Sequence, residues 1–284
     1  MCALRQAAGV PVSEAARVAE VSPEVIRRME SGRITLLGTI HITVLLDRFE
    51  VDDDREPILT LVRMVRQYKK IRRHWWDPYS DLLPEQEIDL LGLEESARVV
   101  SVCGATAVPE LLRTPDYHRA VLRVWDPQES DIDLDRRVEL LTQRRDRLRD
   151  NGIRLRGYIL EAALRNPMGG PEMMAAQLTG LVGRGADKNV SVQVIGSGTG
   201  THLGWHLGDV SMLEFDALVE GVPEPPIVHS QNMLWDIEQD GDDVDGYLGV
   251  FAELRRTALA QKVSRSLIEE IAHGYSDEAT TRSN

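Results

Sequence analysis

Short helical segments separated by turn residues fill the beginning of the chain, and their spacing constrains the fold more than any other feature of the sequence. Helices are expected over Ala3–Ala8, which Gly9 ends, and over Ser13–Ala19. A third helix is expected from Pro23, with Ser22 as its N-cap. Two longer helices are expected after it, over Thr35–Phe49 and Ile58–Ile71. Residues 1–71 are therefore predicted to form an all-α domain.

The second and third of these helices have the spacing of a helix-turn-helix, in which one short helix enters the major groove of DNA. Ala15 and Ala16 are small where the two helices approach closely, and residues 19–21 form the turn. Ile26 and Met29 are three positions apart, so both can face the core. The polar residues of the third helix are then exposed to a groove.

The text LRQAAG, followed by SEAARVAEVSPEVIRRMESGR, resembles the Cro/repressor-like (XRE) helix-turn-helix family. The resemblance implies an ion pair between Arg5 and Glu30. It also places the DNA-binding residues at Ser22, Pro23, Glu24, Arg27, Arg28 and Arg33. The chain departs from the family at Pro11 and Val12, where an N-capping hydroxyl residue and a phosphate-contacting glutamine are usual. A protein-interaction module with a degenerate DNA-binding head is therefore the alternative.

The distribution of charge agrees with a nucleic-acid-binding head, although the chain as a whole has a net charge of −13. Residues 1–75 contain 13 Lys and Arg against 10 Asp and Glu, a net charge of +3. The rest of the chain contains 20 against 36, a net charge of −16. A DNA-binding module joined to a sensor or partner-binding body is expected to show this asymmetry.

The remainder of the chain mixes expected strands with expected helices, which predicts an α+β (α/β-like) body over 93–284 after a linker over 72–92. The strands are expected over Ala97–Val108, Arg156–Leu160, Val190–Ile195, Val210–Phe215 and Pro226–Ser230. The helices are expected over Pro109–Leu122, Leu134–Asn151, Pro171–Val182, Leu248–Ala260 and Val263–Ile271. The fold class is therefore mixed, with an all-α helix-turn-helix head followed by this body.

The text EAALRNPMGGPEMMAAQL at 161–178 and VSVQVIGSGTGTHLG at 190–204 carry a second resemblance. The body is similar to the C-terminal domain of unknown function, described as antitoxin-like or WhiJ-like, of one actinobacterial group of XRE regulators. The resemblance implies a small acidic partner protein. Contact with such a partner must be mainly apolar or use the arginine-rich helix at 136–149. A homodimer is expected because one short recognition helix contacts few bases.

A ligand or partner pocket is the most specific site expected in the body. Its candidate residues are Glu161, Arg165, Trp205, His206, Glu214 and His229. An enzyme using Glu161, Arg165, His206 and Glu214 is a further alternative, but no catalytic set is recognisable, so no enzyme is predicted. Glu161 and Arg165 are four apart and are interpreted primarily as a surface ion pair.

Neither a metal nor a cofactor is expected. His202 and His206 are four apart, but they lie in a glycine-rich stretch where helical spacing does not apply. The acidic run Asp236–Asp245 lacks the ligand spacing of a calcium loop. Two cysteines and the lack of any apolar run of ~20 residues predict a cytoplasmic protein that does not enter a membrane.

Overall fold

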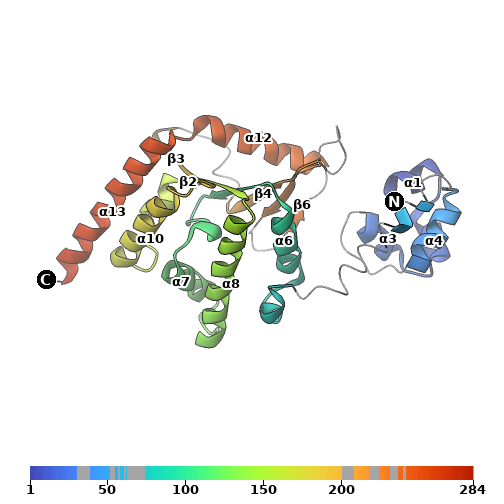
Figure 1. Cartoon of the computed structure of the whole chain (residues 1–284), viewed down its shortest axis with the longest axis horizontal. Coiled ribbons are helices and arrows are strands. Elements are labelled where there is room, and N and C mark those ends of the chain that lie inside the picture. The colour runs from blue at the N-terminus through green and yellow to red at the C-terminus, as the bar shows by residue number, and fades with distance from the viewer. Residues whose placement is uncertain are drawn as a thin grey trace. The chain divides into compact units, whose positions relative to one another are not determined.

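The chain divides into two compact units, Met1–Trp75 and Trp76–Asn284. This is seen in a computed structural model that describes residues 1–30, 39–51, 55–56, 58–60, 62, 74–199, 208–217, 224–230, 236–238 and 241–283. Figure 1 shows the helices and strands of both units.

The first unit is helical throughout its described part. Its helices are α1 (Cys2–Ala7), α2 (Val12–Val18), α3 (Pro23–Glu30) and α4 (Thr39–Arg48). The first three agree with the expected helices to within a residue or two, and the helix expected over Ile58–Ile71 lies mostly outside the described residues. Its main core is made of small and branched side chains, namely Val10, Ala15, Ala16, Ala19, Ile26, Leu45 and Phe49.

The second unit combines helices with a sheet, which places it in the α+β class. Its helices are η1 (Asp77–Tyr79), α6 (Glu85–Ser96), η2 (Glu110–Leu112), α7 (Pro115–Trp125), α8 (Asp131–Asp150), α9 (Glu161–Arg165), α10 (Pro171–Arg184), η3 (Ser197–Thr199), α12 (Gly241–Thr257) and α13 (Gln261–Ser283). Its strands are β1 (Val99–Gly104), β2 (Arg154–Leu160), β3 (Val190–Ile195), β4 (Val210–Glu214), β5 (Ile227–Ser230) and β6 (Asp236–Glu238).

The prediction of a linker over 72–92 was wrong for most of its length. Residues from Trp76 onward belong to the second unit, and α6 begins inside the expected linker. The aromatic and leucine side chains of this stretch are buried, including Trp76, Tyr79, Leu83, Leu90 and Leu91. The prolines and acids that suggested a linker occupy turns and the first turn of α6, where the charge of Glu85 interacts favourably with the helix dipole.

The six strands form one sheet in the order β3-β2-β1-β4-β5-β6. β1, β2 and β3 are parallel, whereas β4 is antiparallel to β1 and the later strands are antiparallel to one another. Helices α6, α7, α8 and α10 lie on one side of this sheet and α12 on the other (Figure 1). Alternate side chains of each strand therefore enter two separate cores.

The connections of the sheet create a switch point between β1 and β4. From β1 the chain moves to β2 and β3 on one side, whereas β4 is added on the other side of β1. In open α/β sheets, ligands bind beside such a point, outside the carboxyl ends of the strands. The carboxyl end of β1, at Gly104, is therefore the place where this fold favours a site.

No helix in the described ranges is both long and apolar enough to cross a membrane.

Candidate functional site

The outward surface of α3 carries most of the residues predicted to contact DNA. Ser22 caps the helix, since its Oγ accepts a hydrogen bond from the Val25 N–H at 3.4 Å. Ser22, Pro23, Glu24 and Arg27 are exposed. Arg27 forms an ion pair with Glu24, with 3.2 Å between Nη1 and Oε2, so its charge is partly neutralised. Arg33 and the side chain of Arg28 lie outside the described part of the chain.

An ion pair between Arg5 and Glu30 joins α1 to the end of α3, as predicted. The guanidinium donates from Nε to Oε1 at 2.7 Å and from Nη2 to Oε2 at 3.0 Å. Its Nη1 also donates to the Val10 carbonyl at 2.8 Å. The hydrogen bond that Arg5 donates to Glu30 raises the pKa of Arg5. Since this geometry uses both carboxylate oxygens, it sets the orientation of α3 relative to α1.

In the body, Glu161 and Arg165 form the surface ion pair that their spacing predicted, with 2.7 Å between Nε and Oε1. The other Glu161 oxygen accepts hydrogen bonds from the backbone N–H and the hydroxyl of Ser197, both at 2.8 Å. The backbone bond is the main reason that the pKa of Glu161 is lowered. Glu161 therefore connects α9 to the loop after β3, which is a structural role.

The structure does not bring the predicted pocket residues together. Glu214 is the last residue of β4 and lies opposite Val99, the first residue of β1. It forms an ion pair with Arg156, with 3.2 Å between Oε2 and Nη1. Glu161, in contrast, follows the carboxyl end of β2. These positions are at opposite ends of the strands, so the prediction of one pocket containing both was wrong. Trp205 and His206 lie outside the described residues. The sequence could not place Glu161 and Glu214 relative to each other, because the direction of each strand in the sheet decides at which end its residues lie.

His229, the remaining predicted pocket residue, belongs to a different and unpredicted site. It lies on β5, fully buried, on the same face of the sheet as Ser211 and Val102, which are its successive neighbours across β4 and β1. Burial, together with the nearby charge of Arg144, lowers its pKa to about 4. The helix α8 covers this face and supplies that arginine.

Arg144 is the centre of a buried cluster of charged groups. It donates from Nε and Nη2 to the two oxygens of Glu94 at 2.6 and 2.7 Å, and from Nη1 to Glu110 at 2.8 Å. The side chains of Arg144 and Glu94 are only 4% and 2% exposed. His118 lies with its Nε2 3.8 Å from Glu110. The cluster therefore ties together α6, η2, α7 and α8.

Carboxylates and histidines in this cluster have shifted pKa values. Burial, followed by the charge of Glu110, raises the pKa of Glu87 to about 7. Burial lowers the pKa of His118 to about 4, although Glu110 opposes the shift. The pKa of Glu110 is lowered to about 2 because the attraction of Arg144, His118 and Arg113 outweighs its burial. At neutral pH the two histidines are neutral and Glu87 is partly protonated.

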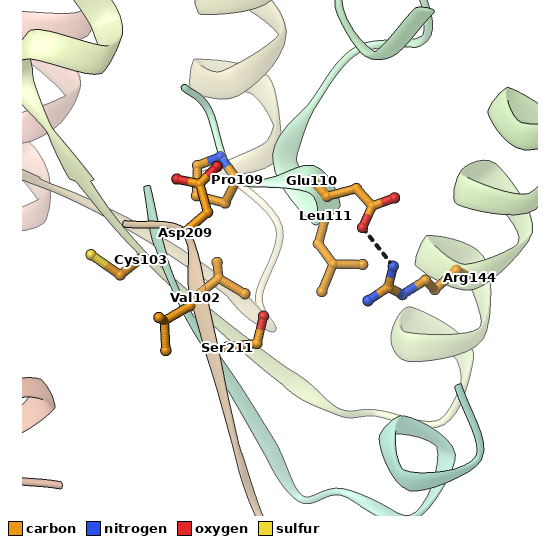
Figure 2. A pocket seen from close by; sticks show the side chains of 9 residues that line it. Val102, Cys103, Pro109, Glu110, Leu111, Arg144, Asp209 and Ser211 are labelled. Atoms are coloured by element: carbon orange, nitrogen blue, oxygen red, sulfur yellow. Dashed lines mark hydrogen bonds and ion pairs between the residues drawn. The ribbon is translucent and has the colours of Figure 1, made fainter. Parts of the chain in front are cut away.

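A small pocket opens beside this cluster at the switch point of the sheet (Figure 2). Its lining comes from the ends of β1 and β4, from η2 and from α8, namely Val102, Cys103, Pro109, Glu110, Leu111, Arg144, Asp209, Val210 and Ser211. Its volume of about 10 Å³ is close to that of one water molecule. In this conformation the pocket is too small for a metabolite-sized ligand.

The polar groups around this pocket do not form a nucleophilic centre. Burial raises the pKa of Cys103 to about 12, so the thiol is protonated and unreactive at neutral pH. Burial also raises the pKa of Asp209, which accepts a hydrogen bond from the Ala105 N–H at 3.3 Å and faces Arg113 at 3.8 Å. In the part of the chain that the structure describes, no three His, Cys, Asp or Glu side chains are grouped to hold a metal ion.

The sequence contained a signal for this cluster that the sequence analysis missed. Leu134, Leu141 and Leu148 repeat every seven residues and are all buried. Arg144 lies three positions after the second leucine and four before the third, so it lies within the apolar stripe of α8. A charged residue in such a stripe must be paired when the helix is covered.

The other arginines of α8 also form hydrogen bonds or ion pairs within the chain, and those of Arg147 and Arg149, which are 50% and 56% exposed, lie at the surface. Arg136 bonds Asp81 and the Pro78 carbonyl, and Arg137 bonds Glu129 and the Leu82 carbonyl. Arg145 donates to the Arg113 carbonyl at 2.7 Å. These bonds attach residues 78–82 to α8, which is why that stretch folds with the body.

Comparison with known proteins finds one family. Residues 88–270 match the model of a family described as a domain of unknown function (DUF5753), and this range covers more than half of the chain. No curated protein and no solved structure matches the chain.

Proposed function

The chain belongs to the DUF5753 family, and from this premise we propose that it is a cytoplasmic, non-enzymatic transcriptional regulator of the XRE type. Its N-terminal unit would be a helix-turn-helix domain that reads double-stranded DNA. Its family domain would bind a partner protein or a ligand, and two chains would act together on two half-sites. A small acidic protein is the partner that the sequence resemblance implies.

The observation that carries this proposal is the exposed face of α3 on a fixed helical support. α2 and α3 pack through Ala15, Ala16 and Ile26, while the ion pair between Arg5 and Glu30 secures the far end of α3. The face that remains exposed is polar and begins with a capped helix N-terminus at Ser22. A short helix presented in this way suits the major groove of DNA.

The division of charge supports the same proposal. The net charge of +3 over residues 1–75 favours approach to phosphate, whereas the −16 over the rest of the chain is repelled by it. DNA would then be contacted by the first unit alone. Dimerisation would raise affinity because two half-sites about 34 Å apart double the number of base contacts.

Selection of bound fragments from random DNA at low salt, with the full chain, tests the proposal. Enrichment of a two-part site is expected. Arg28→Ala should then weaken binding to that site by roughly 1–3 kcal/mol and relax preference at one base pair, if Arg28 contacts a guanine. Arg265→Ala, an exposed change in α13 of the body, is the matched control and should leave binding unchanged. No enriched site, with or without a partner, would refute DNA reading.

A protein-interaction module with a degenerate head is the second candidate. The ion pair between Glu24 and Arg27 favours it, because Glu24 is exposed where phosphate would approach and reduces the charge available from Arg27. Glu24→Gln distinguishes the two candidates. If the head reads DNA, the variant should bind non-specific DNA more tightly than the native chain. If the head is degenerate, neither protein should bind DNA at low salt, while a partner is still retained.

A further inference from the structure

A groove runs between α7 and α10 on the surface of the second unit, away from the charged cluster. Its volume is about 510 Å³, far larger than that of the pocket at the switch point. Thr114, Asp116, Arg119, Ala120, Arg123, Glu172, Met173 and Ala176 line it. Ala120, Met173 and Ala176 supply an apolar floor, and the two alanines allow another chain to approach both helices closely.

The walls of this groove are held rigidly at one end. Gln177 is fully buried and its Oε1 accepts hydrogen bonds from the N–H and the hydroxyl of Thr114, at 2.6 and 3.1 Å. Its Nε2 donates to the Leu112 carbonyl at 3.0 Å. Gly180 allows the close approach, because a Cβ there would lie 2.8 Å from the Thr114 methyl group. The groove is therefore a preformed feature, which lowers the entropic cost of binding.

The charges along the groove are not balanced. Arg119 pairs with Asp135, and Arg123 pairs with Asp131 and donates to the Glu129 carbonyl. The carboxylates of Asp116 and Glu172 are exposed and make no ion pair or hydrogen bond with any described residue. The basic side chains of the groove are thus paired with carboxylates, whereas its two acidic ones face only the N-terminal ends of α7 and α10.

We propose that this groove binds an amphipathic helix of a partner protein, with small or branched apolar side chains on one face and lysine or arginine beside them. The apolar face would lie on Ala120, Met173 and Ala176, a mode of recognition common to helix-binding grooves. Val124, one turn beyond Ala120 and 67% exposed, extends this apolar surface along α7. The flanking cations would pair with Asp116 and Glu172.

This proposal names the partner chemistry left open by the proposed function, but it does not depend on DNA reading. An acidic partner protein would have to present a locally basic helix to use the groove. Binding is measured on the full chain without DNA, so failure of the groove and failure of DNA binding are separate outcomes.

The probe is a fluorescent 14-residue peptide of leucine and lysine with leucine at helical spacing, measured by fluorescence anisotropy at about 0.15 M salt. The same peptide with glutamate in place of lysine is the comparison. The lysine peptide is expected to bind and the glutamate peptide to bind at least about tenfold more weakly. Equal affinity of the two peptides would overturn the proposal.

Ala176→Glu separates the groove from general attraction to an acidic protein. It places a carboxylate on the apolar floor and should weaken binding of the lysine peptide at least about tenfold, although it makes the chain more negative. Ser266→Glu adds the same charge on the exposed surface of α13 and should leave affinity unchanged. Retained affinity in folded Ala176→Glu, judged by circular dichroism, would overturn the proposal.

The double variant Asp116→Asn with Glu172→Gln tests how much the two carboxylates contribute to binding of the lysine peptide. Affinity for the lysine peptide should fall about two- to fivefold, and its salt dependence should become shallower. An unchanged salt dependence would overturn the assigned roles of the two carboxylates. If a second copy of the chain occupied the groove instead, Ala176→Glu would convert a dimer to a monomer in sedimentation, and the proposal would fail.

Discussion

Each of the two units uses an ion pair between arginine and glutamate to hold its helices together, and the two ion pairs differ in how deeply they are buried. In the first unit, Arg5 and Glu30 are 12% and 8% exposed at the rim of a small core. In the second, Arg144 is 4% exposed and two carboxylates, Glu94 and Glu110, converge on it. Loss of Arg5 leaves one carboxylate, which is 8% exposed, whereas loss of Arg144 leaves two, of which Glu94 is 2% exposed. The difference teaches that burial, more than the number of hydrogen bonds, sets the cost of breaking an ion pair.

Removing the central cation of the buried cluster should have the largest effect. Arg144→Met leaves Glu94 and Glu110 without their cation and should lower the free energy of unfolding of the second unit by about 3–5 kcal/mol. Urea unfolding followed by circular dichroism measures it. Arg149→Ala, on the exposed side of the same helix, should change the free energy by less than about 0.5 kcal/mol. Similar losses in both variants would contradict the comparison.

The pH dependence of stability should also come from the buried cluster. The folded-state pKa of His118 and of His229 is about 4, against 6.5 unfolded, so their contribution is lost as pH falls from 6.5 to 4. Glu87 works in the opposite direction: its pKa is about 7, against 4.5 unfolded, so stability rises as pH falls from 7 to 4.5. The two effects therefore partly cancel in the native chain.

Glu87→Gln separates the pH effect of Glu87 from that of the two histidines, because glutamine resembles the protonated acid at every pH. This variant should be more stable than the native chain by roughly 1–3 kcal/mol at pH 8, with the advantage disappearing toward pH 5. Its stability should then fall steadily below pH 6.5, where only the histidine effect remains among these groups. Urea unfolding at pH 8, 7, 6 and 5 measures both curves. Parallel curves would show that Glu87 does not titrate in this range.

Breaking the ion pair of the first unit should cost less. Arg5→Ala removes three hydrogen bonds, but Glu30 can be solvated afterwards, so the loss should be roughly 1–3 kcal/mol. Thermal unfolding of the first unit within the full chain measures it. Arg17→Ala, an exposed arginine of α2, is the control. A loss as large as that in Arg144→Met would remove the distinction between the two units.

The smallest effect is expected in the turn between α2 and α3. Glu20 has φ = 52°, in the left-handed region that disfavours a side chain. Glu20→Gly should remove this strain and raise the stability of the first unit by no more than about 1 kcal/mol, because glycine also loses more entropy on folding. Thermal unfolding measures the change, and Glu50→Gly, at φ = 57°, should behave alike. Destabilisation would show that Glu20 makes a contact that offsets the strain.

Local patterns of the sequence predicted much of the first unit and little of the site in the second. α1, α2 and α3 followed from Gly9, the small residues Ala15 and Ala16, and the cap at Ser22, because these signals act within a few residues. The strands β2, β3 and β4 followed from alternation or apolar runs in the same way. In contrast, the first part of α6 was predicted as a linker because its acids and the prolines before it are typical of loops, whereas only the fold shows that Leu90 and Leu91 are covered.

The sequence by itself determined the first three helices, the split of charge at residue 75 and the pairing of Glu161 with Arg165, since these depend on neighbours along the chain. Only the tertiary structure decided that Glu161 and Glu214 lie at opposite ends of the strands, and that Glu94, Glu110 and Arg144 meet. Glu94 and Glu110 are 50 and 34 positions from Arg144 in the sequence. Helix packing brings these three residues together, and strand direction separates Glu161 from Glu214. The groove between α7 and α10 has the same origin, because neither helix forms it alone.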